Sequence, residues 1–130
     1  MALSDTTVRR LDGVALVSPV GRIDYAGAAP LERTIEPLCA DVSVAALVLD
    51  FSAVEYISSV GLRVLMVAAR ALRARHARLA VAALSPVVAE IFAISRFDAV
   101  LEIFPDVNAA LAALAQRAPP AHGGAATPRR

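Results

Sequence analysis

Two serines and a glycine, Ser58, Ser59 and Gly61, stand where a short β-prone run meets a long helical pattern, in the segment EYISSVGLRVL. Serine is a favoured N-cap residue, so the pair is well suited to begin a helix. Glycine fits poorly in the first helical turn, because it costs about 0.5–1 kcal/mol relative to alanine in a helix. Gly61 therefore indicates that another group comes close to the backbone at this point.

A serine at the start of a helix is also a candidate phosphorylation site. Free backbone N–H groups and the positive end of the helix dipole both favour a phosphate there. Phosphorylation would add about −1.5 to −2 charges without breaking the helix, and a docking partner would sense the change. The residues alone leave both interpretations open, a plain helix cap and a phosphate acceptor.

Other chemically active groups are sparse in this sequence. His76 and His122 have no Cys or His partner at metal-ligand spacing. The sequence contains neither a Gly-rich phosphate loop nor a Gly-x-Ser-x-Gly elbow. We therefore expect a binding protein rather than an enzyme, with no metal or cofactor of its own. The single cysteine, Cys39, fits a reducing compartment and is expected to fill a helix face.

Composition predicts one α/β domain. The chain has 130 residues, of which 58% are hydrophobic and only 5% aromatic, so Val, Leu, Ile and Ala must build one core. Of its 13 basic residues three lie in 117–130, which leaves residues 1–116 with 10 basic and 12 acidic residues. This slightly acidic body argues against nucleic-acid binding. With no signal-peptide h-region and no apolar run near the length of a membrane span, we expect a cytoplasmic protein without membrane insertion.

A β-hairpin is predicted near the amino terminus, because the turn dipeptide Asp12-Gly13 lies between two β-prone runs. The second run, 14–20, contains Pro19, which indicates an irregular or edge strand. The continuous apolar run 46–51 predicts a strand buried on both faces, in the middle of a sheet. ARLAVAAL is a second strand of this buried type.

The segment DYAGAAPLERTIEPLCADV predicts a helix with Asp24 as its N-cap. Because proline removes a backbone donor, Pro30 and Pro37 are expected to make this helix start late or end early. The apolar positions at helical spacing are Leu31, Ile35 and Leu38.

Two later helices have clear sequence signals. The first runs from Ser59 to about Arg75, and its apolar positions are Leu62, Leu65, Met66, Ala69 and Leu72. The second begins with Ser85 as N-cap and Pro86 at the first helical position. Its expected buried side consists of Val87, Val88, Ile91, Phe92 and Ile94.

A short strand in LEIF and a final helix in PDVNAALAALAQR, beginning near Pro105 or Asp106, complete the order β-β-α-β-α-β-α-β-α. Strands that alternate with helices imply parallel pairing with right-handed crossovers. The sequence therefore predicts a mixed, mostly parallel sheet of about five strands, flanked by about four helices.

Four segments of the chain resemble the STAS domain family, and within it the anti-sigma factor antagonists of bacteria. They are GRID, LVLDFSAVEYISSVGLRVL, SPVVAEIFAISRFD and LEIFPDVNAALAAL, in the order and spacing of the family. The resemblance covers residues 5–116 and implies a single STAS-type α/β domain. Residues 117–130, rich in Pro, Gly and Ala, are expected to form a disordered tail.

The resemblance implies a phosphorylation switch at Ser59, the position two residues before Gly61. In such antagonists an anti-sigma factor serine kinase modifies this serine, and a PP2C-type phosphatase restores it. The unphosphorylated protein would bind the anti-sigma factor and free a sigma factor. Many relatives have Asp where this chain has Ser58, so Ser58 could be the acceptor instead.

The resemblance also implies a partner surface around the two serines. Asp24 matches the acidic position of the family best, and Asp50 and Glu55 are alternative carboxylates near the loop. All three have a structural alternative, as a helix cap, a strand-end group or a solvated side chain. A neighbouring helix could likewise cover the two valines of the surface. The residues expected to bind the partner are Asp24, Ser58, Ser59, Val60, Gly61, Arg63 and Val67.

Two other functions compete with the antagonist. One is a STAS scaffold subunit of a stressosome-like assembly or of a lipid-transport complex. The other is a sensor of nucleotides or small ligands, for which the sequence offers no positive signal.

Overall fold

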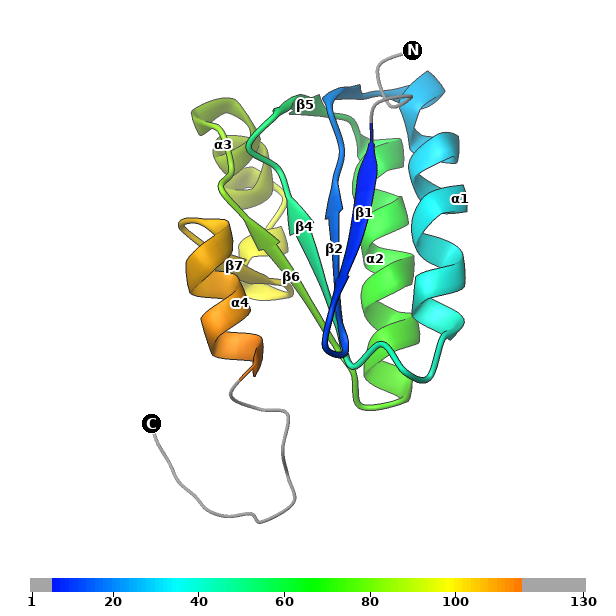
Figure 1. Cartoon of the computed structure of the whole chain (residues 1–130). Coiled ribbons are helices and arrows are strands. Elements are labelled where there is room, and N and C mark those ends of the chain that lie inside the picture. Colours follow the sequence, from blue (N-terminus) through cyan, green and yellow to red (C-terminus); the bar gives the residue numbers. More distant parts are fainter. Residues whose placement is uncertain (1–5, 116–130) are drawn as a thin grey trace.

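The computed structural model describes residues 6–115, which form a five-stranded sheet with helices on both faces (Figure 1). The strand order is β1-β2-β4-β6-β7, with β1 antiparallel to β2 and every other pair parallel. The predicted mixed, mostly parallel sheet is confirmed. Its strands are β1 (Thr7–Leu11), β2 (Val14–Ser18), β4 (Ala46–Asp50), β6 (Arg78–Ala82) and β7 (Glu102–Phe104). The tail predicted at 117–130 lies outside the described residues.

Four helices flank the sheet, as predicted. They are α1 (Tyr25–Ala40), α2 (Ser59–Ala74), α3 (Pro86–Ile94) and α4 (Val107–Ala115). Helices α1, α2 and α3 cover one face, and α4 covers the other with Ala110 and Leu114. No helix among residues 6–115 is long and apolar enough to cross a membrane.

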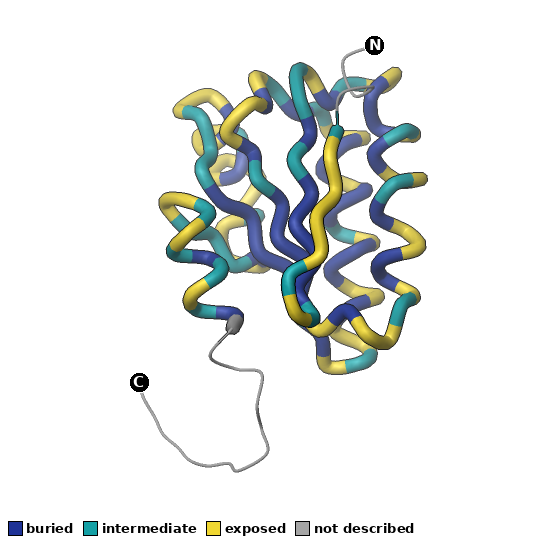
Figure 2. Tube along the Cα trace, in the orientation of Figure 1, coloured by how far each residue is buried: buried dark blue, intermediate teal, exposed yellow. Residues whose placement is uncertain are grey.

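The predicted hairpin joins β1 and β2. Asp12 and Gly13 have φ angles of 49° and 86°, the left-handed values that a type I′ turn requires at both central residues. Strand β4, between β2 and β6, is buried on both faces, as its continuous apolar sequence predicted. By contrast, β1 is the exposed edge of the sheet (Figure 2).

A second, two-stranded sheet was not predicted. It consists of β3 (Gly21–Ile23) and β5 (Val54–Ile57), which pair in parallel. The run expected at 14–20 ends in the main sheet at Ser18, because Pro19 has no N–H to donate to a ladder. Beyond the proline the chain pairs with β5 instead, and the Gly21 amide donates to the Ala53 carbonyl at 2.8 Å.

The expectation that α1 would be shortened by its prolines is wrong. The helix runs unbroken from Tyr25 to Ala40 through Pro30 and Pro37. The carbonyls left without an amide belong to Ala26 and Arg33, four residues before each proline, and both residues are exposed. Water can satisfy these carbonyls, while the other side of the helix buries its apolar residues. The buried residues include Leu31, Ile35 and Leu38, as predicted.

The prediction of a wide buried side on α3 is also wrong. Val87 and Ile94 are 54% and 74% exposed, and Ile91 is only half-buried. The helix packs through the narrow stripe of Val88 and Phe92, and the Phe92 ring contacts two other aromatic rings edge-on. A helix of nine residues at the rim of the sheet has room to bury only one such stripe. On α2, Met66 is likewise half-buried rather than core.

Candidate functional site

The β3–β5 ladder places the starts of α1 and α2 side by side. Ile23 and Ile57, the last residues of the two strands, are paired, and the Ser58 amide donates to the Ile23 carbonyl at 2.9 Å. The next residue along each chain segment, Asp24 or Ser58, caps a helix. Parallel pairing therefore brings two helix N-termini to one edge of the molecule (Figure 1).

Asp24 is the N-cap of α1, as the sequence predicted. Its Oδ1 accepts a hydrogen bond from the Gly27 amide at 3.0 Å, and the residue is half-buried. This carboxylate adds a negative charge beside the positive end of the helix dipole. The two alternative carboxylates, Asp50 and Glu55, do not cap a helix. Asp50 accepts from the Ser52 amide at 3.0 Å, and Glu55 is exposed on β5.

Ser58 is the N-cap of α2, and its hydroxyl is engaged twice. Its Oγ accepts from the Gly61 amide at 3.3 Å and donates to the Ile23 carbonyl at 3.2 Å. The residue is half-buried and has an extended backbone, as an N-cap requires. Phosphorylation of Ser58 would remove the proton that its Oγ donates to the Ile23 carbonyl and would disturb the cap of the helix.

Ser59 occupies the first position of α2, where its side chain is exposed. Among residues 6–115 its hydroxyl has no hydrogen-bond partner. The structure therefore separates two serines that the sequence left equivalent: one hydroxyl holds the helix start together, and the other faces solvent next to it.

Gly61 is buried beneath this helix start. A Cβ at this position would lie 2.7 Å from side-chain atoms of both Ile23 and Ile57, and 3.0 Å from the Ile23 carbonyl oxygen. The close approach that the sequence indicated is made by the β3–β5 ladder of the chain itself. Gly61 thus holds the helix start against this ladder and lies under the surface rather than on it.

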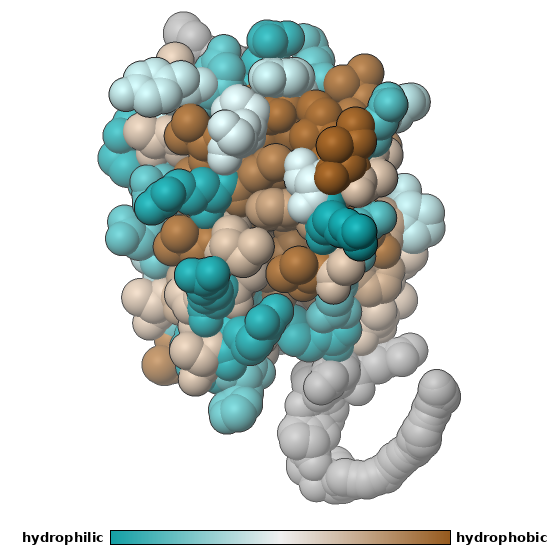
Figure 3. Space-filling view, turned by 180° about the vertical axis from the view of Figure 1, so that it is seen from behind, coloured by the Kyte–Doolittle hydropathy of each residue, from teal (hydrophilic) through white to brown (hydrophobic). Residues whose placement is uncertain are grey.

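The three other α2 residues expected to bind a partner are all exposed. Val60 and Val67 are 38% and 49% exposed, and Arg63 lies between them along the side that faces α1. The surface hollows there to a volume of about 330 Å³, which Tyr25 and Glu32 also line. Figure 3 shows the face of the molecule behind the view of Figure 1, where apolar side chains gather in the upper middle of the view among polar ones.

Tyr25 was missed by sequence reasoning. It follows the Asp24 cap directly, lines the hollow and is 82% exposed. The available signal was its spacing of seven residues from Glu32, which places both residues on one face of α1. An exposed tyrosine beside a helix cap is the kind of side chain that anchors protein interfaces.

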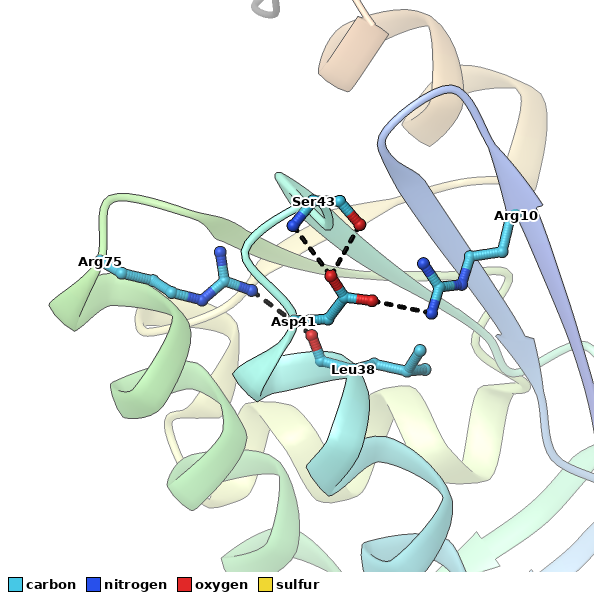
Figure 4. Close-up of polar contacts among 5 residues, drawn as sticks. All are labelled: Arg10, Leu38, Asp41, Ser43 and Arg75. Carbon is cyan, nitrogen blue, oxygen red and sulfur yellow. Dashed lines mark hydrogen bonds and ion pairs between the residues drawn. The ribbon is translucent and has the colours of Figure 1, made fainter.

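The opposite ends of α1 and α2 are tied together by polar contacts (Figure 4). Arg75 donates from Nε to the Cys39 carbonyl at 2.8 Å and from Nη2 to the Leu38 carbonyl at 3.4 Å. Asp41 accepts from the hydroxyl and the amide of Ser43 and forms an ion pair with Arg10 on β1. Both Ser43 bonds, and then Arg10, lower the pKa of Asp41 to about 2.

Cys39 lies at the carboxyl-terminal end of α1 and is buried. Burial raises the pKa of its thiol, and the effect exceeds the opposing influence of Arg75. A thiol held in its protonated form is a poor nucleophile, which agrees with the expected role as a helix-face filler. Residues 6–115 contain no group of three or more His, Cys, Asp or Glu side chains placed to hold a metal ion.

Comparison with known proteins identifies the family. The model of the STAS domain matches residues 5–110. BtrV of Bordetella bronchiseptica, named as an anti-sigma factor antagonist, is 37% identical over 109 residues, which cover 84% of this chain and 90% of BtrV. The crystal structure of an anti-sigma factor antagonist from Mycobacterium paratuberculosis superposes with a TM-score of 0.78 at 34% identity, over 85% of this chain and 92% of that chain.

The fold is also that of the anti-sigma factor antagonist SpoIIAA in its unphosphorylated form. That likeness has a TM-score of 0.66 over 87% of this chain and 98% of SpoIIAA, and at 15% identity it concerns the fold alone. Family model, sequence identity and fold agree over nearly the same residues. The chain therefore belongs to the STAS domain family, alongside anti-sigma factor antagonists of bacteria.

Proposed function

We propose that this chain is an anti-sigma factor antagonist switched by phosphorylation of Ser59. In its unphosphorylated form it binds a kinase-type anti-sigma factor, which then releases a sigma factor. In its phosphorylated form it does not bind. The observation that carries the proposal is the division between the two serines: Ser58 holds the cap, and the Ser59 hydroxyl is exposed without a partner among residues 6–115.

The transfer itself requires nothing from this chain beyond the Ser59 hydroxyl. The Ser59 Oγ attacks the γ-phosphorus of ATP bound to the kinase, the hydroxyl proton passes to a base of the kinase, and ADP leaves. A PP2C-type phosphatase reverses the state by hydrolysing the phosphoester with water. Magnesium and ATP belong to the partner enzymes, and this chain acts as substrate and binding protein.

The position of Ser59 explains how a phosphate could change binding without unfolding the protein. At the first position of α2 the phosphate would meet free backbone N–H groups and the positive end of the dipole, which stabilise it. Next to it, however, lies the apolar surface of Val60 and Val67. A partner that covers this surface would have to desolvate about two negative charges, which is strongly unfavourable.

Similarity to BtrV and to the Mycobacterium paratuberculosis protein supports the antagonist role, because both are named for it and both align over most of their length. Since sigma factors act on RNA polymerase, the proposal places the protein in the cytoplasm. The scaffold alternative requires no phosphate acceptor, and no contact in residues 6–115 favours it over the switch.

The proposal is tested with the kinase-type anti-sigma factor encoded by the same host. With ATP and magnesium the kinase should add one phosphoryl group, which peptide mass spectrometry should map to Ser59. Ser58→Ala should still be phosphorylated, whereas Ser59→Ala should not. Phosphorylation on Ser58 alone would contradict the choice of acceptor, and its absence from both serines would favour the scaffold alternative.

Binding supplies the second half of the test. Calorimetry should show that Ser59→Ala binds the anti-sigma factor as the wild type does, because the hydroxyl makes no contact that folding needs. Ser59→Asp should bind about 100-fold more weakly, because an unpaired charge would enter an apolar interface. Equal affinities of the two variants would overturn the switch.

A further inference from the structure

The surface between α1 and α2 forms a groove that continues well beyond Ser59. We call it the α1–α2 groove, the strip from Tyr25 and Val60 at one end to Cys39 and Ala71 at the other. Besides the hollow of about 330 Å³ near Ser59, it contains a second hollow of about 220 Å³, and the two share Glu32, Val64 and Val67 as lining residues. The groove is therefore continuous along the helix pair.

The groove exists because small side chains face each other across the two helices. On α1 the facing residues recur every three or four positions and include Ala28, Ala29 and Ala40. On α2 they include Ala68 and Ala71. Leucines at these positions would have filled the space, as they do on the faces that meet the sheet. Two helices packed through alanine and valine thus leave an open channel on their outer side.

Apolar side chains in the groove remain in contact with solvent. Val67 is 49% exposed at its middle, and Val60 is 38% exposed at the Ser59 end. Tyr25 lines the same hollow as Val60 and is 82% exposed. A row of exposed apolar side chains along a channel is a common feature of binding sites.

One wall of the groove carries two carboxylates without a cation. Glu32 and Glu36 are exposed, lie one helical turn apart on α1, and both line the groove. The ion pairs within residues 6–115 join Arg10 to Asp41 and Arg78 to Glu102, so neither glutamate has one there. Arg63, at the Ser59 end of the opposite wall, is also not ion-paired within these residues.

We propose that the α1–α2 groove binds an amphipathic helix of the anti-sigma partner. Aliphatic side chains of that helix pack against Val64 and Val67, and two of its basic residues, one turn apart, face Glu32 and Glu36. The inference rests on the proposed function. The stretch of α2 that lines the groove, Val60 to Ala71, is about 17 Å long at 1.5 Å per residue, which matches about three turns of helix.

The charges of the groove select this occupant over others. A fatty acid would have one arginine, Arg63, to attract its carboxylate and two glutamates to repel it, and a neutral ligand would leave both glutamates without a partner. A helix whose basic residues are one turn apart pairs with both glutamates, whereas a helix with acidic residues at those positions would be repelled. The groove also ends beside Ser59, so a phosphate there would stand at the end of the bound helix.

The test measures binding of the host's kinase-type anti-sigma factor by calorimetry. The double variant Glu32→Lys, Glu36→Lys should bind at least about tenfold more weakly, and its affinity should lose most of the salt dependence of the wild type. Val67→Asp should weaken binding by a similar factor. All three positions are exposed, so circular dichroism and the midpoint of thermal unfolding should stay close to those of the wild type.

A matched control is available on α3. Val87→Asp places the same charge on a valine of similar exposure, 54% against 49% for Val67, but outside the groove. It should bind as the wild type does. On the partner-bound wild type, methyl NMR should show shifts at Val64 and Val67 and none at Val87.

The outcomes separate the two proposals. A wild-type chain that neither binds the anti-sigma factor nor is phosphorylated on Ser59 overturns both. A wild-type chain that binds and responds to Ser59→Asp, while the groove variants bind as strongly as it does, overturns the groove alone. Self-association of the chain that the groove variants abolish would also overturn it, and would assign the groove to a second copy.

Discussion

At the amino-terminal end of the α1–α2 pair each helix is capped by the residue that precedes it, Asp24 for α1 and Ser58 for α2. At the carboxyl-terminal end, Arg75 of α2 instead donates to two carbonyls at the end of α1. Asp41 then joins the end of α1 to β1 through Arg10. The amino-terminal end is thus held by the two caps and by the bonds of Ser58 to Ile23, and the carboxyl-terminal end by the side chains of Arg75 and Asp41.

The difference explains how a surface can change its charge while the fold stays intact. Nothing at the amino-terminal end depends on the Ser59 hydroxyl, since the cap belongs to Ser58 and the close packing to Gly61. The hydrogen bonds from Arg75 to α1 lie about 24 Å away, the length of a helix of 16 residues. A phosphate on Ser59 therefore leaves the hydrogen bonds of Arg75 at the carboxyl-terminal end unchanged.

The largest expected effect comes from filling the space beneath the amino-terminal end. Gly61→Val should lower the free energy of unfolding by about 3 kcal/mol, because its side chain would overlap Ile23 and Ile57. Gly61→Ala should lower it less, by about 1–2 kcal/mol, since alanine recovers part of the loss through helix propensity. Urea unfolding measures both changes.

Arg63→Val is the matched control for this substitution. It places valine on the exposed side of the same helix, two residues further along, and should cost no more than about 0.5 kcal/mol. Equal stability of the Gly61→Val variant and the wild type would show that β3 and β5 do not constrain the start of α2.

The next effect concerns the carboxyl-terminal end. Arg75→Ala should lower the free energy of unfolding by about 1–2 kcal/mol, because it removes charge-assisted bonds to the carbonyls of Cys39 and Leu38 from a half-buried site. Arg73→Ala, which removes an exposed arginine from the same helical turn, should change it by less than about 0.5 kcal/mol.

The same variant also tests whether the two ends are independent. The anti-sigma kinase should phosphorylate Ser59 of Arg75→Ala at the wild-type rate, as measured below the unfolding temperature. A large change in that rate would mean that the contacts of Arg75 influence the Ser59 end, and the two ends would not be independent.

A smaller effect distinguishes the two serines. Ser58→Ala should lower the free energy of unfolding by about 1 kcal/mol through loss of the N-cap. Ser59→Ala should change it by less than about 0.5 kcal/mol, because its hydroxyl has no partner within residues 6–115. Thermal or urea unfolding of the two variants side by side measures the difference, and a larger loss for Ser59→Ala would reverse the assigned roles.

Local signals were enough to predict most of the fold. The Asp12-Gly13 turn, the caps at Asp24 and Ser85 and the apolar run of β4 each depend on neighbouring residues, and all were confirmed. The β3–β5 ladder was missed because it pairs segments more than thirty residues apart, and β3 has only three residues. A pattern that short carries no periodicity to recognise.

The candidate site divides in the same way. The sequence drew attention to Ser58, Ser59 and Gly61, but it could not say which serine is the cap, because either one suits that position. The choice follows from the register of β3 against β5, which brings the Ile23 carbonyl to the amide and the hydroxyl of Ser58. The exposure of Tyr25 and of Val67 depends on how α1 lies against α2, which no local pattern reports.

The smallest expected effect is the pH dependence of the carboxyl-terminal end. Because the pKa of Asp41 in the folded protein, about 2, lies below its ordinary value of 3.8, the ionised carboxylate stabilises the fold at pH values above about 4. This contribution should be lost as the pH falls from about 4 through 2. In urea unfolding, Asp41→Asn should therefore have a lower free energy of unfolding than the wild type at pH 6, and the difference should shrink towards pH 2. Ser43→Ala should move the loss to higher pH, because the Ser43 hydroxyl is the largest cause of the lowered pKa. If the difference in free energy of unfolding stays the same down to pH 2, the charge of Asp41 does not stabilise this end.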